Sequence, residues 1–120
     1  MSTELPPQIQ NQLAQLQQLQ QQGQALVSQK SQIEIMIKEI EAALKELETA
    51  ADDQIIYKSV GDILIKSEKA KIQEDLTEKK DIMDLRLKTM AKQEERIQSR
   101  FIQLQDQLKQ ALGEAPPRGG

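Results

Sequence analysis

The stretch that decides the fold lies near the middle of the chain and reads Ile55-Ile56-Tyr57-Lys58-Ser59-Val60-Gly61-Asp62-Ile63-Leu64-Ile65-Lys66. Two runs rich in β-branched residues flank a Gly-Asp pair, which predicts a β-hairpin over 55–66. Alternation along the first strand points Ile55 and Tyr57 to one face and Ile56 and Val60 to the other. The second strand divides its apolar residues in the same way. A half-buried hairpin has one polar face, whereas both faces of this hairpin are apolar.

Such a hairpin needs partners. A two-stranded hairpin is marginal in water by itself, and a pair of helices covers at most one of its faces. The second face and the strand edges then remain open to other chains. We therefore expect self-assembly through the hairpin. The predicted oligomerisation residues are Ile55, Ile56, Tyr57, Val60, Gly61, Ile63, Leu64 and Ile65.

A long helix is predicted before the hairpin. Pro6-Pro7 favours a helix start, because proline is tolerated in the first turn and disrupts later ones. Apolar residues then recur with alternating spacings of four and three as far as Ala51, which is typical of a coiled coil. Asp52-Asp53 opposes the negative end of the helix dipole. These signals predict a helix over 7–51.

A second stripe with the same spacing runs from Leu76 to Ala111 and predicts a helix over 67–112. Ser67 is the expected N-cap and Gly113 the expected C-cap glycine. We expect residues 113–120 to form a disordered tail. The length of 120 residues fits a single domain over 1–120.

If the hairpin forms the bend, the two helices pair antiparallel, and the residue numbers of facing positions sum to about 120. The layers expected from this register are Leu16–Leu104, Leu19–Phe101, Gly23–Ile97, Ile33–Leu87, Ile37–Met83 and Leu44–Leu76. The register also leaves Lys30 and Glu94 about one turn apart. In one interpretation, the Lys30 side chain reaches from the helix interface into solvent, and Glu94 only flanks it. In the other, the two side chains form a cross-helix ion pair that fixes the register.

Composition excludes several function classes. The chain has one Phe, one Tyr and no Trp, Cys or His, so a compact aromatic core, disulfides and thiolate chemistry are not expected. The formal net charge of −3 argues against nucleic-acid binding, which needs a basic face. No apolar run is long enough to span a membrane, and the N-terminus lacks a secretory pattern. We expect a cytoplasmic protein.

No catalytic site, metal site or cofactor site is expected. Without His or Cys, a base would have to be a carboxylate or a lysine, and a helical hairpin offers no concave pocket. Asp52-Asp53 and Glu74-Asp75 could be read as metal ligands, but adjacent acidic residues at the ends of helices are usually solvated. The glycines before the tail are isolated, so no phosphate-binding loop is present. The sequence therefore predicts no enzyme.

Two segments of the chain resemble those of a known protein family. The segments Leu16-Gln17-Gln18-Leu19-Gln20 and Ile56-Tyr57-Lys58-Ser59-Val60-Gly61-Asp62-Ile63-Leu64 are similar to those of prefoldin subunits. The single hairpin indicates the beta class, of the archaeal type, and the resemblance covers roughly residues 5–112. It implies a mainly α fold, in which a β-hairpin joins the two helices of a long antiparallel coiled coil. The hairpins of several subunits assemble into an intersubunit β-barrel.

The resemblance also implies a function and partners. Two alpha-class and four beta-class subunits would form a hexamer whose coiled coils project from a platform of hairpins. Such complexes hold unfolded polypeptides without ATP and deliver them to a group II chaperonin. The alternative is a structural or tethering coiled coil that binds one specific folded partner. A holdase suppresses aggregation of several unrelated proteins, whereas a tether does not.

The terminal end of the coiled coil is the expected client-binding surface. Glu4 is the first ionisable side chain and Lys30 is the next, so the first helix begins as a neutral, glutamine-rich helix with a leucine stripe. Gln12 and Gln107 reduce the apolar packing between the helices there, so we expect the helix ends to fray. Fraying would expose aliphatic side chains that can contact any unfolded chain. The predicted client-binding residues are Leu5, Ile9, Leu13, Leu108 and Leu112.

Overall fold

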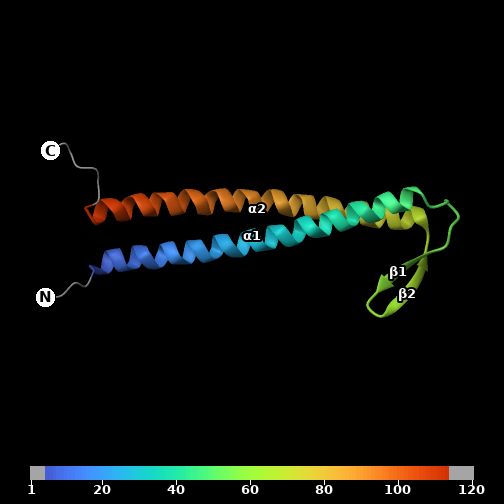
Figure 1. The fold of residues 1–120 in the computed structure, drawn as a ribbon, viewed down its shortest axis with the longest axis horizontal. Helices are drawn as coiled ribbons and strands as arrows, with labels where there is room; N and C mark the ends of the chain where they lie inside the picture. Colours follow the sequence, from blue (N-terminus) through green and yellow to red (C-terminus); the bar gives the residue numbers. More distant parts are fainter. Residues whose placement is uncertain (1–4, 114–120) are drawn as a thin grey trace. The chain divides into compact units, whose positions relative to one another are not determined.

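The computed structural model describes residues 5–113, so the predicted tail lies outside the described residues except for Gly113. The element order is α1 (Pro7–Glu48), β1 (Ile56–Val60), β2 (Ile63–Ser67) and α2 (Lys69–Ala111), as Figure 1 shows. Two long helices are thus joined by an antiparallel β-hairpin. The predicted fold class is confirmed, while its assembly into a β-barrel stays a prediction.

The chain divides into two compact units, each built from a part of both helices. Among the described residues, unit 1 contains residues 5–29 and 90–113, and unit 2 spans Lys30–Thr89 with the hairpin. Each unit has a small aliphatic core on the predicted stripes. The buried residues are Ile9, Leu26, Leu104 and Leu108 in unit 1 and Ile33, Ile37, Ile40 and Met83 in unit 2.

One contact in each unit fixes how its two helices pair. In unit 1, a Cβ atom built on Gly23 would lie 3.7 Å from Ile97 Cγ2, which confirms the predicted Gly23–Ile97 layer. In unit 2, Lys80 Nζ lies 3.8 Å from Glu41 Oε2, and these residue numbers also sum to nearly 120. Both units therefore have the antiparallel register that the stripes predict.

α1 starts where Pro6-Pro7 predicts a helix start. The Pro6 carbonyl accepts hydrogen bonds from the backbone N–H groups of Ile9 and Gln10, both at 3.0 Å. Pro7 is the first helical residue, where its missing N–H leaves no helical hydrogen bond unmade. Helix formation at Pro7 therefore follows from backbone chemistry and not from side-chain packing alone.

The end of α1 falls at Glu48, three residues before the predicted position. The N–H groups of Thr49 and Ala50 bond to carbonyls three residues earlier, at 3.2 and 3.1 Å. The Thr49 hydroxyl also donates to the Glu46 carbonyl at 2.8 Å. These short-range bonds tighten the last turn and end the α-helical pattern.

Of the two residues predicted to cap α2, one is wrong and one is confirmed. Ser67 is not the N-cap, because it is the last residue of β2 and pairs with Ile56. The Glu68 carbonyl accepts the first helical bond, from Ile72 N–H at 3.0 Å, so Glu68 occupies the cap position. At the other end Gly113 has φ 77° and its N–H bonds to Gln110 at 3.1 Å, as expected of a helix-ending glycine.

Candidate oligomerisation and client-binding surfaces

The hairpin of unit 2 is closed by a two-residue turn. Val60 pairs with Ile63 at the end of the ladder, which leaves Gly61 and Asp62 as the turn. Gly61 has φ 59°, and no non-glycine residue in the described part of the chain has a positive φ. A positive φ at the first turn position only is the pattern of a type II′ turn, for which glycine is favoured.

The pairing register assigns side chains to faces, because directly opposite residues of an antiparallel pair share one face. The aliphatic face, as we name it, consists of Ile56, Lys58, Val60, Ile63, Ile65 and Ser67, and the tyrosine face consists of Tyr57, Ser59, Leu64 and Lys66. The aliphatic face thus presents four β-branched apolar side chains. Tyr57 and Leu64 make the opposite face apolar as well, in agreement with the pattern in the sequence.

These apolar side chains lie largely in solvent. Ile55, Tyr57, Val60, Ile63, Leu64 and Ile65 are each between 48% and 68% exposed, and Ile56 is half-buried. Gly61 lies at the exposed turn. Within residues 5–113 the sheet has two strands only, so each strand has one edge without a β-sheet neighbour. The structure therefore presents all eight predicted oligomerisation residues in one exposed hairpin.

Polar contacts attach the hairpin and its preceding loop to the start of α2. Lys69 Nζ donates to the Ala50 carbonyl at 2.9 Å and lies 3.4 Å from Asp52 Oδ1. Lys58 of the aliphatic face lies 3.9 Å from Asp75 Oδ2. Lys71 Nζ lies 3.1 Å from Asp75 Oδ1, and this hydrogen bond and the carboxylate charge raise the pKa of Lys71. Exposed ion pairs stabilise weakly, so they do not replace a packed partner for the hairpin.

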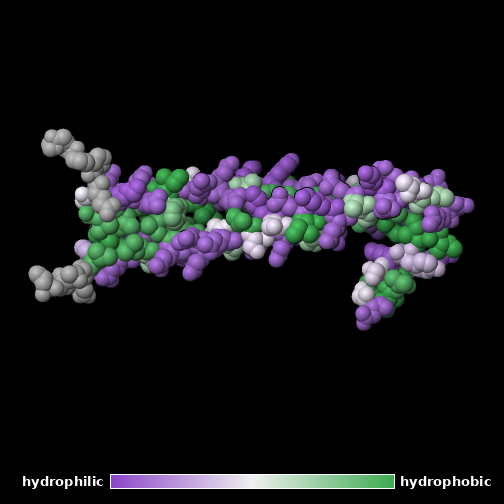
Figure 2. All heavy atoms as spheres, in the orientation of Figure 1, coloured by the Kyte–Doolittle hydropathy of each residue, from purple (hydrophilic) through white to green (hydrophobic). Residues whose placement is uncertain are grey.

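The terminal end of unit 1 carries the five predicted client-binding residues in unequal environments. Leu5 and Leu112 are 38% and 44% exposed, whereas Ile9 and Leu108 are only 7% and 8% exposed. Leu13 is half-buried. Figure 2 shows hydrophobic residues gathered over the start of α1 and the end of α2. Two of the five residues are therefore accessible in this conformation, and Ile9 and Leu108 are core residues.

A polar atom interrupts that core. Gln12 Oε1 is buried and has no hydrogen-bond partner in the described structure. A buried acceptor without a partner costs free energy, about 1–3 kcal/mol in typical cases. Glutamine at a core position of the stripe was visible in the sequence, but the loss of its hydrogen bond is visible only in the structure.

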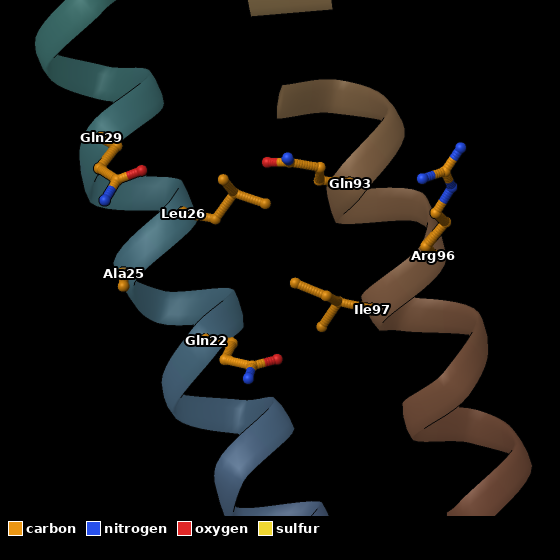
Figure 3. A pocket seen from close by; sticks show the side chains of 7 residues that line it. All are labelled: Gln22, Ala25, Leu26, Gln29, Gln93, Arg96 and Ile97. Carbon is orange, nitrogen blue, oxygen red and sulfur yellow. The ribbon is translucent and has the colours of Figure 1, made fainter. Parts of the chain in front are cut away.

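Two open grooves lie between α1 and α2 in unit 1, both on the same side of the helix pair. The sequence patterns did not indicate them. The first has a volume of about 380 Å³ and an almost entirely apolar exposed surface, and it is lined by Gln22, Ala25, Leu26, Gln29, Gln93, Arg96 and Ile97. Figure 3 shows Leu26 and Ile97 pointing toward each other across it. The second, of about 150 Å³, shares Gln22 and continues toward Gln15 and Leu104.

Residues 5–113 lack both a metal-ligand cluster and a membrane-spanning helix. These residues contain no group of three or more metal-ligating side chains. Neither helix combines the length and the hydrophobicity that a membrane span requires.

The geometry defines a class, namely proteins with two long antiparallel helices joined by an exposed β-hairpin. Residues 10–115 match the sequence model of a family described as prefoldin subunit. The chain is 68% identical over 120 residues to the prefoldin subunit beta of Methanothrix thermoacetophila, and both chains are covered completely. It is 47% identical over 109 residues to the prefoldin subunit beta of Archaeoglobus fulgidus, covering 91% of this chain and 94% of the relative.

A solved structure agrees with these sequence matches. The crystal structure of the prefoldin beta subunit from Thermococcus strain KS-1 superposes with a TM-score of 0.82 at 35% sequence identity, covering 97% of this chain and 100% of that chain. The chain therefore belongs to the prefoldin family of chaperone subunits, and its predicted resemblance to the beta class is confirmed.

Proposed function

We propose that the chain is a subunit of an ATP-independent holdase that binds unfolded polypeptides and delivers them to a group II chaperonin in the cytoplasm. The observation that carries this proposal is the hairpin with exposed apolar residues on both faces, in a chain of the prefoldin family. Exposed apolar surface of this kind marks an interaction site. A hexamer of two alpha-class and four beta-class subunits would bury it.

In this proposal the hairpins of neighbouring subunits form a double β-barrel platform. Edge-to-edge pairing satisfies the backbone groups at the open edges of β1 and β2. The aliphatic faces then supply the apolar interior. Ile63 and Ile65, at 64% and 49% exposure, gain the free energy of burial only in the assembly, which makes hairpin assembly thermodynamically favourable.

The client-binding surface in this proposal is the terminal end of unit 1. Leu5 and Leu112 are exposed already, and a local opening of the helix ends would add Ile9 and Leu108. The buried, unpaired Gln12 oxygen lowers the free energy that such an opening requires. Non-directional hydrophobic contact then accepts many sequences, as a holdase needs.

The experiment compares suppression of aggregation by the assembled complex for three unrelated denatured proteins, measured by light scattering. A holdase suppresses all three without ATP. The alternative function, a tether for one folded partner, predicts no suppression. An assembly that lacks residues 1–13 and 105–120 should keep its number of subunits and lose most of its suppression, and full suppression by this truncated assembly would move the client site away from the terminal end.

A further inference from the structure

We propose that the seam of unit 1 between Gln15 and Gln29 is a second client-binding site, selective for extended segments that combine aliphatic and acidic residues. The inference rests on the proposed holdase function and adds a site and a sequence preference to it. The seam comprises the two consecutive grooves that share Gln22. All of its lining residues belong to unit 1.

The floor of the seam selects aliphatic side chains. Ala25, Leu26 and Ile97 line the larger groove, and Leu19 and Leu104 line the smaller one. Leu26 and Leu104 are nearly fully buried, so they form a packed base and not a loose patch. An aliphatic side chain that enters the larger groove removes apolar surface from water without the need to displace polar groups.

The α1 rim of the seam is neutral and amide-rich. Gln15, Gln18, Gln22 and Gln29 line it, and Figure 3 shows Gln22 of α1 and Gln93 of α2 extending toward the facing helix. Each glutamine amide offers both donors and an acceptor. These amides can therefore bond to the peptide groups of an extended chain, whatever its sequence. The distance from Gln15 to Gln29 along the helix is about 21 Å at 1.5 Å per residue, which matches about six extended residues.

The α2 rim supplies the charge. Arg96 lines the larger groove and Arg100 the smaller one, and both side chains are exposed. Arg96 and Arg100 are four residues apart and lie on adjacent turns of one helix face, so two cations stand beside the grooves. No charged residue of α1 lines either groove. Glu95 lines an adjacent groove with both arginines and offsets part of their charge. The remaining positive charge is complementary to carboxylates on a bound segment, and it disfavours basic segments.

The test uses the assembled complex and fluorescently labelled ten-residue peptides, with binding followed by anisotropy. One peptide alternates Leu with Asp, one alternates Leu with Lys, and one alternates Ser with Asp. We expect the Leu/Asp peptide to bind about fivefold more tightly than the Leu/Lys peptide, the scale of two exposed ion pairs. It should also bind more tightly than the Ser/Asp peptide, because only Leu fills the apolar groove.

The variant Arg96→Gln/Arg100→Gln should remove the preference for acid, and the control Lys79→Gln/Lys88→Gln, which removes two exposed charges from unit 2, should retain it. An unchanged preference in the arginine variant would overturn the proposal, as would an equal loss in the control. If the complex suppresses aggregation but shows no peptide preference, only this second site fails. If it suppresses no aggregation, the holdase function itself fails.

Discussion

Gly23 of α1 and Ile97 of α2 face each other in unit 1 at a separation that leaves room for one methyl group. A Cβ atom at Gly23 would lie 3.7 Å from Ile97 Cγ2, which is ordinary van der Waals contact. Glycine is therefore not required there by close backbone approach. In the middle of α1 it instead carries the entropic cost of a flexible residue in a helix.

Gly23→Ala should consequently stabilise the chain by about 0.5–1 kcal/mol, because alanine is the better helix former and its methyl group fits against Ile97. Urea denaturation followed by circular dichroism measures the change. Gly61→Ala is the matched control and should destabilise the chain, because its φ of 59° disfavours a residue with a Cβ atom. Destabilisation by Gly23→Ala would mean that the helices approach more closely than in this structure.

Gln12→Leu should stabilise the terminal end of unit 1 by about 1 kcal/mol, because it replaces a buried oxygen without a partner by an apolar group. The same change should slow hydrogen exchange near Ile9 and Leu108 and weaken suppression of client aggregation. Gln17→Leu, at an exposed position of the same helix, is the control. Stronger client binding by Gln12→Leu would contradict the proposed opening.

The relation between Lys30 and Glu94 stays a prediction with two outcomes. A double-mutant cycle with Lys30→Gln and Glu94→Gln should give a coupling of about 0.5–1 kcal/mol if the two side chains pair. Additive effects of the single variants would show that each side chain acts alone.

The sequence predicted the long-range arrangement well, because helix stripes and a Gly-Asp turn are repeated, local signals. The Gly23–Ile97 layer followed from summing residue numbers about a central hairpin. The ends of the helices were harder to predict. Ser67 has the chemistry of an N-cap, yet its pairing with Ile56 extends β2 and moves the cap to Glu68.

The site residues were predictable as a set and not one by one. Apolar residues on both faces of the hairpin followed from period-two alternation, and the structure places them in solvent. Leu108 and Leu112 were predicted together as client-binding residues, yet the stripe passes through Leu108 and Ala111 and omits Leu112. The structure accordingly buries Leu108 and leaves Leu112 exposed. The seam grooves depend on the spacing and side-chain directions of two facing helices, which no single segment of sequence encodes.

The most direct test of the account is the mass of the complex formed with an alpha-class prefoldin subunit, measured by light scattering for the wild-type chain and for Ile63→Asp/Ile65→Asp. We predict a hexamer for the wild type and loss of higher oligomers for the variant, with helical circular dichroism retained. Ile82→Asp/Leu85→Asp, which alters two similarly exposed apolar residues of α2, should still form the hexamer. A hairpin variant that keeps the wild-type mass would contradict assembly through the hairpin.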